Sequence, residues 1–217
     1  MAQGKTKAGK GRRASAKAVA RLASAIALHQ RGQLKEAEEV YLAVLAADHD
    51  NADALPYLRP YARRLVGVDL SPKMLAQAAK RALYDESVAA ELGSFLRASP
   101  GGFDVVASSD TLVYFGDLGE VLAAARRSLR PGGRLVFTLE HEANEAQAPA
   151  GYRIHPHGRY SHTESYVRST LADAGFELLE LEKANLRREG AAYVNGLVVA
   201  ACAAGGAGSD ASSSRIP

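Results

Sequence analysis

The sequence predicts an α/β fold of parallel βα units, closed by an antiparallel hairpin and preceded by an α-helical hairpin. The apolar run 65–69 ends in Asp69 and is followed by Ser71-Pro72, the cap and first-turn residues of a helix. Strand and helix patterns alternate downstream of this run, which is typical of a parallel sheet. Strand patterns at 176–185 and 193–202 are joined by a link too short for a crossover, so they must be antiparallel.

The N-terminal part predicts a basic tail and two short helices. Residues 1–17 carry a charge of +6 against +3 for the whole chain, so the remainder is at −3. A tail of this composition cannot bury a core, and we expect it to be disordered. Over residues 18–55, apolar side chains repeat at helical spacing on either side of Gly32. This helical hairpin resembles a tetratricopeptide repeat, although an ordinary hairpin packed on the main domain would show the same pattern.

Residues 56–203 form the expected α/β domain. Besides the strand 65–69, strand patterns cover 103–107 and 134–140, the second introduced by a Pro131-Gly132-Gly133 turn, and a short strand or connector covers 88–92. Helix patterns cover 72–83, 117–129 and 163–174. Residues 204–217 are rich in Gly and Ser and predict a second disordered tail.

Composition excludes several classes of protein. Cys202 is the single cysteine, so a disulfide framework and a cysteine-based zinc site are excluded, and a reducing, cytoplasmic location is expected. No run of 18 apolar residues exists, so we expect no membrane span. No aromatic side chain interleaves with the basic tail, and we do not expect nucleic acid as a partner.

Five short stretches occur in an order and spacing that resemble the class I S-adenosylmethionine-dependent methyltransferases. They are Val66–Leu75, Phe103–Ala107, Leu129–Leu135, Gly158–His162 and Ala174–Glu177. With the helical hairpin, the chain most resembles bacterial predicted methyltransferases that carry tetratricopeptide repeats. The resemblance implies a Rossmann-like methyltransferase sheet, S-adenosylmethionine as cofactor and a methyl acceptor that is a small molecule or a protein. The helical hairpin is then a candidate surface for a protein partner.

The resemblance also implies roles for four residues in binding the cofactor. Asp69 would accept hydrogen bonds from both ribose hydroxyls, since a carboxylate offers two acceptor oxygens in one plane. Leu70 would pack on the adenine, and Glu91 would accept from the adenine amino group. Asp110 follows a strand at the carboxyl edge of the sheet, where ligands bind in open α/β folds; a turn or helix cap is its other interpretation.

Tyr160 and His162 are the candidates for the acceptor side and for catalysis, with Tyr114 next. A general base is optional in methyl transfer, and a polar loop that packs before helix 163–174 would show the same residues. His155 and His157 lie close to His162 in the sequence, but no cysteine or helical Glu-x-x-His pattern supports a metal, and we expect none.

The chain departs from the family where the first strand and its glycine-rich loop should lie. No glycine occurs between Gly32 and Gly67, and the join near Leu55-Pro56 has the appearance of a deletion of the central first strand. In the family that strand lies between the strands 65–69 and 103–107, so we expect these two to pair directly, to receive another segment, or to be poorly stable. The alternative to an active enzyme is a catalytically impaired, methyltransferase-like protein that acts as an interaction module.

Overall fold

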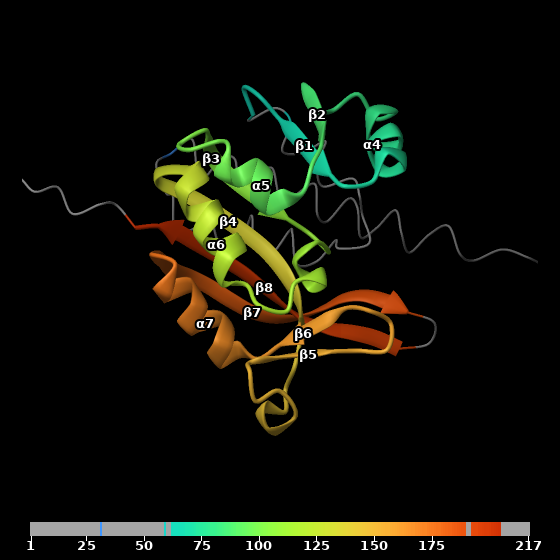
Figure 1. The fold of residues 1–217 in the computed structure, drawn as a ribbon, viewed down its shortest axis with the longest axis vertical. Coiled ribbons are helices and arrows are strands. Elements are labelled where there is room, and N and C mark those ends of the chain that lie inside the picture. Colours follow the sequence, from blue (N-terminus) through green and yellow to red (C-terminus); the bar gives the residue numbers. More distant parts are fainter. Residues whose placement is uncertain (1–30, 32–58, 60–61, 190–191, 205–217) are drawn as a thin grey trace, which may run out of the picture. The chain divides into compact units, whose positions relative to one another are not determined.

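The computed structural model describes residues 31, 59, 62–189 and 192–204. They fall into two compact units, and each is described by itself (Figure 1). Unit 1 holds the described residues up to Ala89 together with 183–198, and unit 2 holds Ala90–Glu182 with the residues from Val199 onward. The basic tail, the helical hairpin 18–55 apart from Arg31, and the C-terminal tail apart from Ala204 lie outside the described residues.

Unit 1 contains one βαβ motif. Strand β1 (Val66–Asp69) pairs in parallel with β2 (Glu86–Ala89), and helix α4 (Pro72–Ala79) connects them. The Ser71 hydroxyl accepts from the Met74 amide and Pro72 opens the first turn, as the sequence predicts. Gly67 is required by a close approach, because a Cβ there would lie 2.9 Å from the ring of Tyr84.

The larger sheet has the strand order β5-β6-β4-β8-β7, with β3 paired to β4. Its strands are β3 (Phe103–Ser108), β4 (Leu129–His141), β5 (Tyr152–Ile154), β6 (Tyr160–His162), β7 (Phe176–Glu189) and β8 (Ala192–Ala203). Strands β3 and β6 run parallel to β4, whereas β5 is antiparallel to β6. The carboxyl ends of β3, β4 and β6 therefore lie at the same edge of the sheet.

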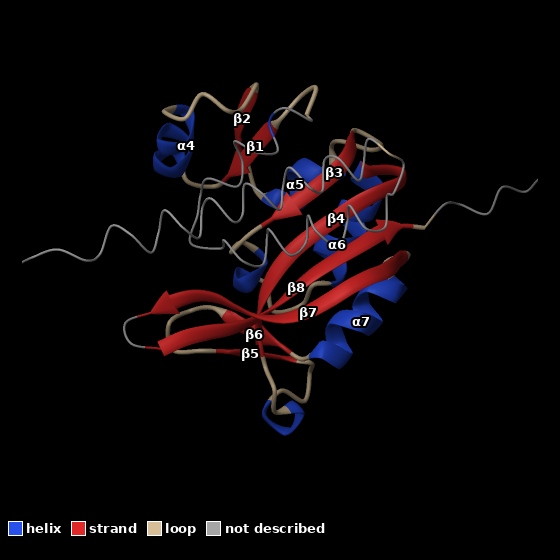
Figure 2. Cartoon of the chain, turned by 180° about the vertical axis from the view of Figure 1, so that it is seen from behind, coloured by secondary structure: helices blue, strands red, loops and turns tan. Residues whose placement is uncertain are grey.

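Three helices of unit 2 cover one face of this sheet (Figures 1 and 2). They are α5 (Leu92–Arg97), α6 (Gly119–Ser128) and α7 (Glu164–Asp173), with short 3₁₀ turns η2 (Leu112–Tyr114) and η3 (Glu145–Gln147) in the connections. The core of the unit lies between helices and sheet. Its most buried side chains include Val113, Leu118, Leu122, Leu135, Phe137, Leu139, Val167, Leu171 and Val199. No helix of the described residues is long and apolar enough to cross a membrane.

The strand at 65–69 and its α/β alternation are confirmed, and three details differ. The connector at 88–92 is the strand β2 at 86–89 followed by α5, and the turn at Pro131–Gly133 lies inside β4. There the pairing shifts from Phe103↔Leu129 to Val105↔Arg134, so the turn residues bulge out of the ladder without ending the strand. Strands β1 and β3 do not pair among the described residues, because they belong to separate sheets.

Candidate functional site

Asp69 is the last residue of β1, and its carboxylate turns back toward the start of α4. Its Oδ1 accepts from the Ser71 amide at 2.7 Å, which holds the side chain in one orientation. The Oδ2 atom makes no hydrogen bond with the described part of the chain, and the neighbouring Leu70 is 71% exposed. A fixed acid with one unused oxygen beside an exposed apolar side chain can bind a polar ring such as a ribose.

Glu91 serves as the N-cap of α5. Its Oε1 accepts from the Gly93 amide and its Oε2 from the Ser94 amide, both at 2.6 Å. These bonds, that from the Gly93 amide foremost, hold the pKa of Glu91 below its ordinary value, with Arg97 3.8 Å away adding to the effect. Both oxygens therefore serve the helix, so an adenine amino group would have to share an oxygen that a backbone amide already uses.

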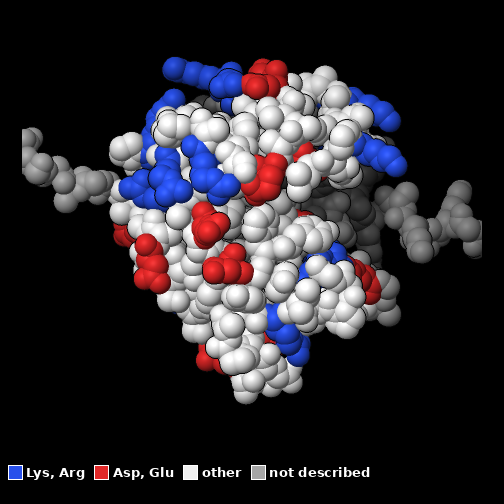
Figure 3. Space-filling model, in the orientation of Figure 1, with Lys and Arg blue, Asp and Glu red and all other residues white. Residues whose placement is uncertain are grey.

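A cavity of about 300 Å³ lies in unit 2 beside this cap. It is lined by Glu91, Gly93, Arg97, Phe115, Asp117, Glu120 and Val121. The face drawn in Figure 3 carries basic and acidic side chains close together over these helices. The cavity thus joins the residues around the α5 cap to the loop that leads into α6.

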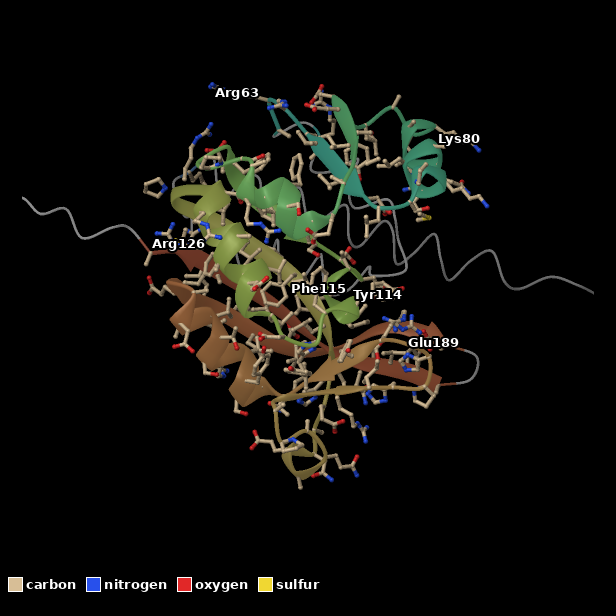
Figure 4. The ribbon with its side chains drawn as sticks, viewed as in Figure 1. Arg63, Lys80, Tyr114, Phe115, Arg126 and Glu189 are labelled. Carbon is tan, nitrogen blue, oxygen red and sulfur yellow. The ribbon has the colours of Figure 1, made fainter. Side chains whose placement is uncertain are left out.

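Asp110 follows β3 in the left-handed backbone region, with φ of +54°. Its amide donates to the Thr138 hydroxyl of β4 at 3.2 Å. A non-glycine residue in this conformation is uncommon, although aspartate tolerates it better than most, and such residues cluster at functional sites. Next in the chain, η2 exposes Tyr114 by 62%, and Figure 4 shows Tyr114 and Phe115 side by side at its end.

His162 and Tyr160 belong to an aromatic cluster under the loop 115–118. The His162 side chain is fully buried, and its Nε2 donates to the Gly116 carbonyl at 2.9 Å, while its buried Nδ1 has no hydrogen-bond partner among the described residues. Burial lowers the pKa of His162, opposed in part by the Gly116 and Phe115 carbonyls. Tyr160 packs edge-on against Tyr152 at a ring distance of 5.9 Å.

The same cluster fixes the loop that lines the cavity. The Tyr166 hydroxyl donates to Asp117 Oδ1 at 3.0 Å and accepts from the Leu118 amide at 2.9 Å. A Cβ at Gly116 would lie 2.8 Å from both Tyr152 and Tyr160, so glycine is required there. His162 therefore contacts this loop from the interior, and its ring is closed off from solvent.

Of the predicted site residues of unit 2, Glu91 lines the cavity. Phe115 and Asp117, in the loop after Tyr114, line it as well. Asp110 contacts β4 through Thr138. Sequence reasoning missed Phe115 and Asp117, although Gly116 between them signalled a close approach. It also missed Glu140 and Glu142 at the end of β4, because the burial of a glutamate is not visible in the local sequence pattern. No group of three or more His, Cys, Asp or Glu residues suited to a metal occurs among the residues that the structure describes.

Comparison with known proteins gives a consistent result. Residues 51–137 match the family described as "Methyltransferase domain". A ubiquinone biosynthesis O-methyltransferase from Thiobacillus denitrificans is 35% identical over 130 residues, which are 53% of this chain and 56% of that protein. The chain covers 22% to 56% of the length of the curated relatives that it matches.

Solved structures show the same fold. A SAM-dependent methyltransferase from Methanosarcina mazei has a TM-score of 0.51 at 18% identity, over 64% of this chain and 81% of that chain. The N-methyltransferase NodS from Bradyrhizobium japonicum, solved with S-adenosyl-L-homocysteine, has a TM-score of 0.52 at 20% identity, over 72% and 74%. Residues 51–137 of this chain thus match a methyltransferase domain, and the chain has the α/β fold of the S-adenosylmethionine-dependent methyltransferases.

Proposed function

We propose that this chain is an S-adenosylmethionine-dependent methyltransferase that acts on a small-molecule or protein acceptor. The observation that carries the proposal is the junction of β1 and α4. There a strand ends in an acid that is held by the start of the next helix and whose second oxygen makes no hydrogen bond to the described residues. This junction lies in the segment that matches a methyltransferase domain.

The residues present fit the cofactor in part. Asp69 would hold the ribose through Oδ2, and the exposed Leu70 would cover one face of the adenine. Glu91 fits less well, because its carboxylate caps α5 with both oxygens, and no glycine between Gly32 and Gly67 supplies the close backbone approach of the family. When bound, S-adenosylmethionine supplies a methyl group on a positively charged sulfur.

The protein's own task is then to orient the acceptor and exclude water, since displacement at a methyl group depends chiefly on alignment. We assign Asp110, at the carboxyl edge of β3, to the cofactor side and Tyr160 to the acceptor side. His162 supports this arrangement from the interior: its bond to the Gly116 carbonyl holds the loop that carries Phe115 and Asp117.

Titration calorimetry of the full chain with S-adenosylmethionine tests the proposal. We expect a dissociation constant in the micromolar range. Asp69→Asn keeps an acceptor for the Ser71 amide but removes the charge and one acceptor oxygen. Loss of one charge-assisted hydrogen bond costs about 1.5–3 kcal/mol, so binding should weaken at least about tenfold.

Glu86→Gln is the matched control, because this acid lies in the same two-stranded sheet, 48% exposed, at the opposite end from Asp69. It should bind as the unchanged protein does. A folded sample that gives no heat of binding would refute the proposal and favour the alternative, an interaction module that has lost activity. Circular dichroism of the same samples establishes that each is folded.

A further inference from the structure

A row of one threonine and two buried acids runs along the end of β4, the strand that contacts Asp110, and just beyond it. Thr138 and Glu140 lie on one face of β4, and Glu142 continues this alternation just beyond the strand. The two glutamate side chains are each only 8% exposed. Because successive residues of this row are about 6.6 Å apart, the row extends from the Asp110–Thr138 hydrogen bond toward the β5–β6 hairpin.

The second acid of this row holds a histidine through a serine. The Ser161 hydroxyl lies 3.3 Å from Glu142 Oε2 and 2.7 Å from His155 Nε2. Because the hydroxyl has one proton and donates it to the carboxylate, it must accept from His155, which places the imidazole proton on Nε2. In neutral His155 the Nδ1 lone pair is therefore free, and within the described residues no group donates to it.

The backbone around His155 is fixed as well. The His155 amide donates to the Arg159 carbonyl at 2.9 Å, and the Gly158 amide donates to the His155 carbonyl at 2.8 Å. Gly158 adopts a φ of +81°, which closes this tight turn. An imidazole with a fixed backbone, a fixed tautomer and an available lone pair meets the geometric conditions for a general base.

The charges around His155 favour one class of acceptor. Glu142 pairs with Arg153 at 2.9 Å, and Glu140 pairs with Arg159 at 3.2 Å, with His157 4.0 Å from the same carboxylate. The carboxylates are buried, whereas the side chains of Arg153 and His157 are 38% and 42% exposed. The more exposed members of these pairs are thus cationic or neutral groups, which disfavour a protonated amine and favour a neutral or anionic acceptor.

We propose that His155 is the general base for a methyl acceptor with an acidic O–H group, a phenol, and that Ser161 and Glu142 are positioning residues. This inference rests on the proposed methyltransferase function. The acceptor O–H bond breaks and its proton passes to His155 Nδ1. The oxygen electron pair forms the new O–CH₃ bond as the S–CH₃ bond breaks, its pair staying on sulfur. The imidazolium, held by Ser161 and Glu142, later returns its proton to water.

The first test needs neither cofactor nor turnover. Long-range ¹H–¹⁵N spectra of the full chain at pH 8 report which ring nitrogen of each histidine carries the proton, and His155→Gln identifies the His155 signals. We expect the Nε2-protonated form, and Ser161→Ala should remove this preference. A proton on Nδ1 in the unchanged protein, or the same tautomer in Ser161→Ala as in the unchanged protein, would overturn the proposal.

The second test uses catechol as the phenol probe. With S-adenosylmethionine, we expect catechol methylation whose kcat falls about a hundredfold or more in His155→Gln, while KM changes little. In the unchanged protein, kcat should rise with pH as a single group loses its proton, and His155→Gln should lack this dependence. Arg168→Gln is the control, since Arg168 is half exposed on α7, pairs with Glu164 one turn away and belongs to no part of the cluster around His155.

The two proposals fail in different ways. If S-adenosylmethionine gives no heat of binding, the methyltransferase function fails, whatever the histidine spectra show. If it binds but catechol is not methylated, or is methylated equally by His155→Gln, the phenol and its base are refuted while the methyltransferase function stands.

Discussion

Acidification should destabilise this protein through His162. The ring is fully buried and its pKa is lowered by burial, so the folded protein keeps it neutral where an unfolded chain would protonate it. A histidine in an unfolded chain has a pKa of about 6.5. Below that pH the unfolded state binds more protons than the folded state, so the free energy of unfolding falls as the pH falls.

The size of this effect follows from linkage. With the folded ring neutral throughout, lowering the pH from 7.5 to 5.5 removes about 1.4 kcal/mol of stability, since the unfolded ring becomes largely protonated over that range. His162→Gln removes the titration while its amide can still donate to the Gly116 carbonyl. Other titrating groups are common to both proteins, so the difference between the two isolates His162.

Urea unfolding followed by circular dichroism suits the measurement, because the chain has no tryptophan. At a urea dependence of about 1–3 kcal/mol per molar, the midpoint of the unchanged protein should fall between pH 7.5 and 5.5 by about 0.5–1.4 M more than that of His162→Gln. Equal shifts in the two proteins would show that the ring is not held neutral, and the reasoning would be refuted.

Four further substitutions test the packing of unit 2 by the same urea assay. Gly151→Ala should cost about 3 kcal/mol or more, because its Cβ would overlap the Tyr166 ring at a φ of +87°; Gly158→Ala, at +81° with no atom within 4 Å, should cost only about 1–2 kcal/mol. Equal losses would refute this. Tyr166→Phe leaves the Leu118 amide unpaired and should cost about 1–3 kcal/mol. Glu91→Ala should cost about 1 kcal/mol as a lost helix cap, and faster hydrogen exchange should be confined to α5.

The parts of the fold with strong local signals were predictable. The apolar run before Asp69 and the Ser71-Pro72 cap identify β1 and the start of α4, and Thr163 likewise caps α7. Strands β5 and β6 were missed because each has three residues and pairs through contacts distant in sequence. A three-residue strand shows too little alternation for its period to be read.

The candidate site was less predictable, because its side chains also have structural roles. Glu91 follows a strand as a cofactor acid would, but its carboxylate caps α5, and the sequence does not show which amides lie within reach. His162 follows a glycine turn among polar residues, yet a pairing of β6 with β4 carries it into the core. Burial of a polar residue depends on tertiary packing, which a local pattern does not record.

The aromatic cluster has a consequence for how the protein would respond to two ligands at once. Segment 151–166 holds the loop 115–118 through Tyr166 and His162, and that loop forms one wall of the cavity. A ligand that favours one arrangement of the cavity wall therefore also biases the segment that carries His155. Because such coupling is reciprocal, an acceptor at the proposed β5–β6 site that changed the affinity of the cavity for a ligand would have its own affinity changed by the same factor.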